Sequence, residues 1–426
     1  MHVCLVTIEH LNRDHPLSGG ALRVMGLAHV FKKSGFSVSL LRQKSQVEPS
    51  PDELLFEIEE IRQDGLIRMN LAARISEINP DVVVVEQWGL LDQLEGLDIP
   101  LFCDLHGSLL WENYYRNQRG DYDLRAKMMA LSRCNGFLVP GLRQKYYFLA
   151  FAMASGMDMA EPKILQLPLL LPSDWYQGHR QIHSDQRVVC GGGNWPWIDM
   201  GDRSWVEQYL DSKDLKFYQY DCTPQQSALN PTHTESKRIG SGIPHRQIPA
   251  LYAGAIAAWD WYGCNREREL AITTRTVEYL YCGVPVFYPT GLELSDFIEK
   301  HKLGILLSDY RDLQGVDNLQ GRLLQARENL SVGLENLWDQ EAVCEGLTKF
   351  IKNPRPRAKA YGGIAELEAE KRLLVQKNQA LLDENEHLIK VQKKLLSDLS
   401  ILKEEKSELA FRWQRDIKRL SDQKTG

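Results

Sequence analysis

Short apolar runs alternate with amphipathic stretches over the first 172 residues. Residues 3–8 form an apolar run, and a loop with glycines follows before apolar positions recur at helical spacing over residues 21–34. Residues 81–86 are nearly all valine, as in a strand that is buried on both faces. Further strands are expected at residues 37–41, 101–105 and 136–139. Strands and helices that alternate in this way predict a parallel sheet covered by helices.

The same alternation starts again after Pro172. Strands are expected at residues 187–190, 215–220, 284–287 and 304–307, with a helix near residues 248–253. Thr273 or Thr274 can cap another helix that runs to about Tyr281 and is closed by Gly283. We therefore expect an α/β fold with two Rossmann-like domains, residues 1–172 and 173–352, and a cleft where the carboxyl ends of their strands meet.

The last part of the chain has a different pattern. Residues 353–363 are rich in proline and glycine and are expected to be a linker. A heptad repeat of leucine follows, which predicts a coiled coil over residues 364–420 and a homodimer formed through it. Asn378 and Asn385 at partner positions of the repeat favour a fixed register and often a parallel pair. The alternative is a solvated helix that packs on its own chain. The repeating leucines are Leu367, Leu374, Leu381, Leu388, Leu395, Leu402 and Leu409.

Composition excludes several classes of protein. The 426 residues are 43% apolar and carry a net charge of -6, so nothing favours nucleic acid as the main partner. The eight cysteines have no C-x-x-C spacing and are expected to be buried free thiols of a reducing compartment. The N-terminus lacks the basic start and long apolar stretch of a signal peptide, and no run approaches the roughly 18 apolar residues of a membrane span. We expect a cytoplasmic protein.

The chemistry is concentrated between Glu267 and Gly291. Thr274 and Arg275 lie in the first turn of the expected helix, and Glu278 follows one turn later. A helix N-terminus with an arginine and an acid nearby suits a phosphorylated, hydroxylated ligand.

The segment Glu278-Tyr-Leu-Tyr-Cys-Gly283-Val-Pro285-Val286 resembles the nucleotide-sugar site of retaining GT-B glycosyltransferases. Arg275 and Thr276 before it, and Gly291 and Gly304 after it, are similar to bacterial surface-polysaccharide glycosyltransferases. The resemblance implies that Glu278 binds the nucleotide ribose and that Thr274, Arg275 and Gly291 also contact the donor.

The same resemblance implies a second acid eight residues before Glu278, where this chain has Leu270. Glu267 is the first candidate for the acid near the sugar, and Glu269 is the second. Their alternative is a solvated charge cluster with Arg266 and Arg268.

Three further segments match the family by position. Gly192, Gly193 and Asn194 follow a strand and are expected to approach the donor diphosphate, or else to form an ordinary turn. Gly19 and Gly20 follow the first strand and are expected to line the cleft. His106 directly follows another strand and, in the resemblance, orients a hydroxyl of the sugar or acceptor.

The resemblance implies a glycosyltransferase that moves a sugar from a nucleotide diphosphate sugar to a glycan or lipid-linked acceptor in surface polysaccharide biosynthesis. Retention of configuration, no metal and no other cofactor are expected with it, and peripheral contact with a membrane is left open. Two alternatives remain. One is a non-catalytic GT-B scaffold that assembles a polysaccharide complex through its coiled coil. The other is a sugar-nucleotide epimerase or hydrolase on the same fold.

Overall fold

The computed structural model forms two compact units, Met1–Ala360 and Tyr361–Gly426. It describes residues 1–426 except 44–54, 59, 64–65, 70, 95, 117–120, 178–184, 193–194, 196, 221–241, 335–338, 355–361 and 423–426. Gly193 and Asn194 therefore lie outside the described residues.

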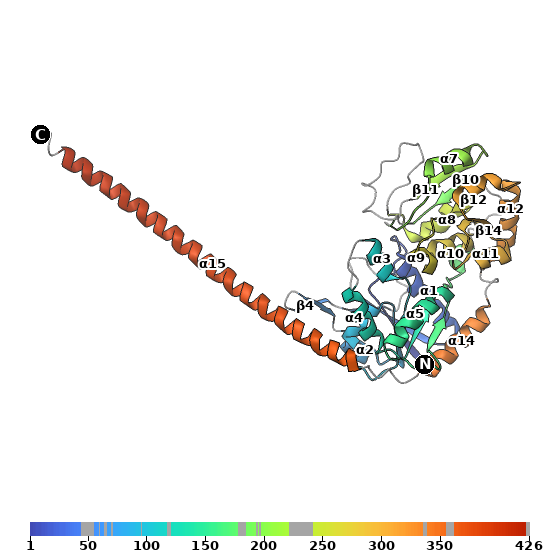
Figure 1. The fold of residues 1–426 in the computed structure, drawn as a ribbon, viewed down its shortest axis with the longest axis horizontal. Coiled ribbons are helices and arrows are strands. Elements are labelled where there is room, and N and C mark those ends of the chain that lie inside the picture. The colour runs from blue at the N-terminus through green and yellow to red at the C-terminus, as the bar shows by residue number, and fades with distance from the viewer. Residues whose placement is uncertain are drawn as a thin grey trace. The chain divides into compact units, whose positions relative to one another are not determined.

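The first domain contains a seven-stranded parallel sheet in the order β3-β2-β1-β6-β7-β8-β9 (Figure 1). Its strands are β1 (His2–Thr7), β2 (Ser37–Gln43), β3 (Leu55–Ile58), β6 (Val82–Val85), β7 (Leu101–Asp104), β8 (Gly136–Val139) and β9 (Ile164–Gln166). Its helices are α1 (Gly19–Lys33), α2 (Leu71–Ile78), α3 (Leu109–Tyr115), α4 (Asp121–Leu131) and α5 (Leu142–Ala154), and β4 (Glu60–Gln63) and β5 (Leu66–Met69) form an antiparallel pair.

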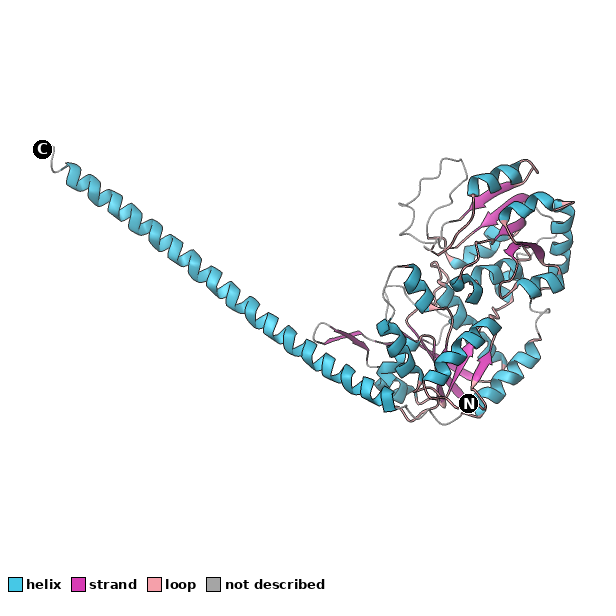
Figure 2. Cartoon of the chain, viewed as in Figure 1, coloured by secondary structure: helices cyan, strands magenta, loops and turns pink. Residues whose placement is uncertain are grey.

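The second domain contains a five-stranded parallel sheet in the order β11-β10-β12-β13-β14. Its strands are β10 (Asp185–Cys190), β11 (Lys216–Gln219), β12 (Ala255–Trp259), β13 (Val286–Pro289) and β14 (Gly304–Leu307). Its helices are α7 (Arg203–Asp211), α8 (Ile248–Tyr252), α9 (Arg266–Leu270), α10 (Thr274–Tyr281), α11 (Ser295–His301) and α12 (Leu319–Leu330). Figure 2 shows each set of strands enclosed by helices. The expected α/β class with two Rossmann-like domains is confirmed.

Two of the elements that the sequence analysis did not predict lie directly before helix α10 in the chain. The central strand β12 was not predicted, because its sequence, Ala-Ile-Ala-Ala-Trp, is rich in a residue that favours helices. The charged stretch around Glu267, for which no helix was predicted, is the short helix α9, whose N-terminus is capped by the Asn265 side chain.

Apolar contacts hold the two domains together. Leu22 and Leu171 belong to the same buried cluster as Val277 and Leu280 of α10. Helix α14 (Gln340–Lys352) follows the second sheet in sequence but packs on the first, since its Leu347 and Ile351 share a core with Val3 and Leu5 of β1.

The second unit contains one long helix, α15 (Gly362–Asp422). Its described leucines are about half exposed or more, including Leu374, Leu381, Leu388 and Leu395. In the described part of the chain, no helix combines the length and apolarity that a bilayer crossing requires. The described cysteines are free thiols, and Cys264 among them is exposed, unlike the buried thiols expected.

Candidate active site

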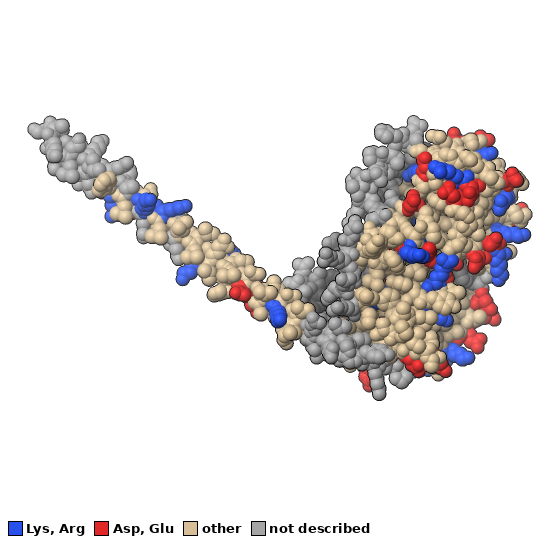
Figure 3. Space-filling view, viewed as in Figure 1, with Lys and Arg blue, Asp and Glu red and all other residues tan. Residues whose placement is uncertain are grey.

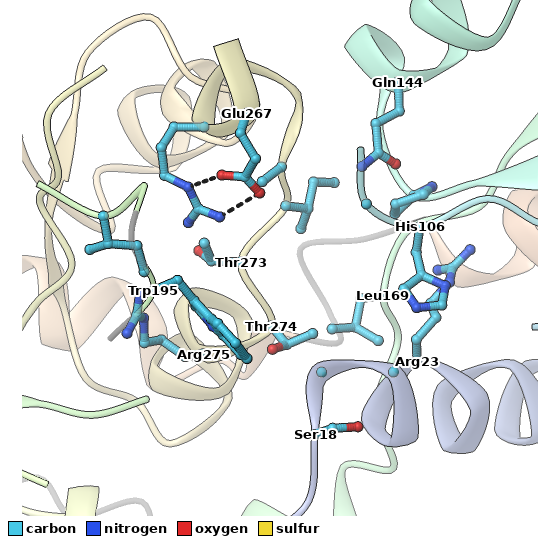
Figure 4. Close-up of a pocket in the computed structure, with 18 of the residues that line it drawn as sticks. Ser18, Arg23, His106, Gln144, Leu169, Trp195, Glu267, Thr273, Thr274 and Arg275 are labelled. Carbon is cyan, nitrogen blue, oxygen red and sulfur yellow. Dashed lines mark hydrogen bonds and ion pairs between the residues drawn. The ribbon is translucent and has the colours of Figure 1, made fainter. Parts of the chain in front are cut away.

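A cavity of about 440 Å³ lies between the two domains at the carboxyl ends of their strands. Ser18, Arg23 and His106 line it from the first domain, and Trp195, Glu267 and Arg275 line it from the second (Figure 4). Its volume is within the range of small-molecule sites. The domains come close at Gly19, where an added Cβ would lie 3.2 Å from Thr274 Oγ1.

Arg275 lines the second-domain wall of the cavity. Its Nη1 donates to the Gly191 carbonyl at 2.5 Å, its Nε lies 2.8 Å from Asp260 Oδ1, and its guanidinium lies 4.5 Å from the centroid of the Tyr262 ring. Gly192 has φ +95°, and a Cβ there would lie 2.4 Å from Arg275 Nη1. The structure therefore brings the predicted residues Gly192, Thr274 and Arg275 together at the start of α10.

Asp260 is a site residue that the sequence analysis missed. It directly follows β12, is 1% exposed, and accepts hydrogen bonds from the hydroxyls of Thr273 and Thr276. Burial raises the pKa of this carboxyl, while the charge of Arg275 opposes that rise. Recognition of β12 as a strand would have placed an acid at its carboxyl end, beside the cleft.

His106 lies on the first-domain wall between two carboxylates. Its Nδ1 is 3.2 Å from Asp104 Oδ2, and its Nε2 is 3.0 Å from Glu86 Oε1. Burial opposes its charge, but the hydrogen bonds to Asp104 and Glu86 raise the pKa of His106 to about 10. Asp104 is held in turn by Arg23, a buried cation that the sequence analysis did not single out. His106 is therefore an imidazolium at neutral pH, with Nδ1 hydrogen-bonded to Asp104 and Nε2 in an ion pair with Glu86.

Glu267 and Glu269 have different environments. Glu267 is 3% exposed, lines the cavity and pairs through both oxygens with Arg268, so a solvated cluster is wrong for this residue. Glu269 is not among the described residues that line the cavity, and it pairs with Arg266 at the surface. Of the two acids, Glu267 is therefore the one that lines the cavity.

Glu278 does not line this cavity in the structure. Its Oε1 accepts a hydrogen bond from the Tyr176 hydroxyl at 3.2 Å and lies 2.7 Å from His245 Nε2. Arg13 Nε donates to His245 Nδ1 at 3.1 Å. Because an arginine is always a donor, His245 Nδ1 is the acceptor and Nε2–H donates to Glu278. A chain of hydrogen bonds thus runs from a loop of the first domain to the predicted ribose-binding acid.

The other predicted glycines have separate positions. Gly20 lines the cavity, and a Cβ there would lie 2.7 Å from Glu9 Oε1 and 2.8 Å from Glu86 Oε1. Gly291 has φ +73° and lines a different depression of about 620 Å³. In the described residues, no three His, Cys, Asp or Glu side chains come together as a metal site would require.

Comparisons with known proteins identify the fold. No family model and no curated protein sequence matches this chain. Among solved structures, sucrose-phosphate synthase from Thermosynechococcus elongatus has a TM-score of 0.56 at 12% identity, covering 83% of this chain and 98% of that one. TarM of S. aureus in a complex with UDP has a TM-score of 0.58 at 11% identity, covering 83% and 100%. HepE of Anabaena in complex with UDP-glucose has a TM-score of 0.58 at 12% identity, covering 82% and 99%.

These structural neighbours are GT-B glycosyltransferases, and the chain has their GT-B fold. The fold prediction made from the Glu278–Val286 motif is therefore confirmed. At 12% identity or less in these three structures, the likeness extends to the fold alone.

Proposed function

We propose that the protein is a glycosyltransferase that takes its sugar from a nucleotide diphosphate sugar bound in the cavity between the two domains. The observation that carries this proposal is the position of Arg275. It lies in the first turn of α10, against the glycine loop after β10, inside the cavity. A helix N-terminus, a guanidinium and a close backbone together favour a diphosphate. UDP or UDP-glucose in the structures of TarM and HepE is consistent with this proposal.

The state of His106 is consistent with retention of configuration. An imidazolium has no free lone pair, so His106 cannot accept the acceptor's proton. In the proposed step the acceptor oxygen bonds to the anomeric carbon as the bond from that carbon to the diphosphate breaks. The acceptor's proton passes to the departing diphosphate on the same face of the sugar. Arg275 and the first turn of α10 then stabilise the developing negative charge.

The acceptor is proposed from the sequence resemblance: a growing surface glycan or its lipid-linked precursor, used in the cytoplasm. His106 and Arg23 on the first-domain wall line the part of the cavity proposed for the acceptor. Glu267, neutralised by Arg268, is the proposed acid beside the transferred sugar.

A thermal-shift screen with nucleoside diphosphates and their sugars tests the donor site. A ligand at 100 times its dissociation constant should stabilise the protein by about 2.7 kcal/mol. For a unit of this size, that corresponds to an increase in Tm of roughly 4 °C. Arg275→Lys keeps the positive charge but cannot contact both Asp260 and the Gly191 carbonyl as the guanidinium does. It should strongly reduce the increase in Tm that the nucleotide causes. Arg246→Ala, which removes an exposed pair with Asp14, is the matched control and should leave it unchanged. No shift with any nucleotide would contradict the proposal.

A non-catalytic scaffold remains the second candidate because of Glu278. Its carboxylate is engaged by His245 and Tyr176, not directed into the cavity. Assays with each nucleotide sugar and a mixture of glycan acceptors separate the candidates. Nucleotide binding without any transfer would favour the scaffold, whereas sugar transfer would exclude it.

We also propose that α15 joins two copies of the chain. Its described apolar side chains are exposed in the single chain, and they follow a heptad repeat. A chain that ends at residue 360 should therefore be a monomer in sedimentation velocity, while the full chain is a dimer. A truncated chain that remains dimeric would place the interface in the first unit instead.

A further inference from the structure

The apolar side chains of α15 form one wide stripe along the helix. With Leu374, Leu381, Leu388, Leu395 and Leu402 at heptad position d, position e carries Val375, Leu382, Ile389 and Leu396. All of these side chains are about half exposed or more in the single chain. In Figure 3, most of the described surface of the helix is neither acidic nor basic. A second helix that covers this stripe must therefore cover position e as well as position d.

The N-terminal and C-terminal halves of α15 carry opposite net charges. Residues 362–389 contain six acidic and three basic residues, and residues 390–422 contain six acidic and nine basic residues. The first half therefore has a net charge of -3 and the second a net charge of +3. The sign changes at Lys390, close to the middle of α15.

We infer that two copies of α15 pair antiparallel, with the twofold axis near Lys390. This inference rests on the proposed dimer and adds its direction. Antiparallel pairing places the acidic half of each helix against the basic half of the other. Parallel pairing would place like charges together along the whole length, which costs free energy.

Position e gives an independent argument for the same direction. In a parallel pair, position e contacts position g of the other helix, so Leu382 would meet Lys377 and Ile389 would meet Glu384 of the second copy. In an antiparallel pair centred near Lys390, e contacts e. Leu382 then meets Leu396 of the second copy, and Ile389 meets its own counterpart. Only the antiparallel pair covers these apolar side chains with apolar partners.

The residues at position a favour parallel pairing in one respect and antiparallel pairing in another. A parallel pair would let Asn378 and Asn385 hydrogen-bond their counterparts, but it would also bring Lys406 against Lys406. In the antiparallel register Lys406 lies beside Leu374 of the second copy, and Asn385 lies beside Leu395. Two amide pairs at position a contribute less than the burial of Leu382 and Ile389 from both helices. The apolar stripe and the charge halves therefore decide the direction.

The direction has a consequence for the assembly. The folded units are attached at the N-terminal ends of the two helices. A 61-residue helix is about 90 Å long, so antiparallel pairing separates these two points of attachment by about that distance.

Cysteine cross-linking in the full chain tests the direction. Asn378→Cys and Leu402→Cys are each made in a background where the exposed Cys264 is replaced by Ser, and this background is the control. The residue pair 378 and 402 is in contact in the antiparallel register. We expect neither variant to form a disulfide-linked dimer alone under mild oxidation, and the two co-expressed chains to form one with each other.

Efficient cross-linking of each variant with itself would show a parallel pair and overturn the inference, while the proposed dimer would stand. A monomer in sedimentation velocity would overturn both. Native mass spectrometry of the co-expressed, oxidised chains identifies the mixed dimer directly. None of these measurements depends on enzymatic activity. The direction of the helices can therefore be tested even if the protein transfers no sugar.

Discussion

Replacing Arg275 by Ala is expected to lower the free energy of unfolding by about 3 to 5 kcal/mol, because it leaves the Asp260 carboxylate buried without its cation. The loss should depend on pH. Without Arg275 the folded-state pKa of Asp260 rises further above its unfolded value, so the variant is least destabilised at acidic pH. Stability is then lost as the pH rises through that pKa. Urea unfolding of both proteins at pH 5 and pH 8 measures the difference.

The double variant Arg275→Met/Asp260→Asn distinguishes a lost pair from general damage. It removes both charges and should recover much of the stability lost by Arg275→Ala. Arg246→Ala breaks an exposed ion pair and should cost no more than about 1 kcal/mol. An Arg275→Ala loss as small as that of the control, or independent of pH, would mean that Asp260 does not depend on Arg275.

Replacing Lys127 by Met is expected to raise the free energy of unfolding by about 3 kcal/mol at pH 7. Lys127 is 1% exposed, and its ammonium lies 4.5 and 4.8 Å from the ring centroids of Phe148 and Phe151. Burial lowers the pKa of Lys127 from 10.5 to about 8. Each unit of pKa shift corresponds to about 1.36 kcal/mol. Here this free energy is the cost of keeping the buried ammonium charged.

The sign of this effect gives the pH range for the measurement. The unfolded chain binds the lysine proton more tightly, so the cost is fully present below pH 8 and declines between pH 8 and 10.5. The gain from Lys127→Met should shrink over that range. Lys213→Met is the matched control, because Lys213 also lies over an aromatic ring, that of Tyr209, but is exposed. Its effect should stay within about 0.5 kcal/mol. A destabilised Lys127→Met protein would show that the ammonium contributes a favourable interaction.

The regular elements were predictable because their signals are local. The valine run at β6 and the apolar run at β1 both predicted buried strands, and the structure places both in the parallel sheet. Thr273 or Thr274 was predicted to cap α10, and the structure places Thr273 at the N-cap position without a side-chain cap hydrogen bond. β12 was missed because alanine carries no strand preference, and its burial follows from its central place between β10 and β13.

The partners of the site residues were not predictable in the same way. Arg275 pairs with Asp260, fifteen positions earlier, and donates to Gly191, which is 84 positions away. Glu278 has the motif of a ribose ligand, yet its observed partners are Tyr176 and His245. His106 was named from its place after a strand, but the two carboxylates that keep it charged come from different strand ends.

The sequence by itself determined the α/β class, the alternation that builds two parallel sheets, and the heptad repeat of α15, since each depends on spacing within one segment. Only the tertiary structure decided which charges are buried, which are neutralised and which face the cavity. Those properties depend on distances between segments far apart in the chain, and on how much water the packed domains exclude from each group.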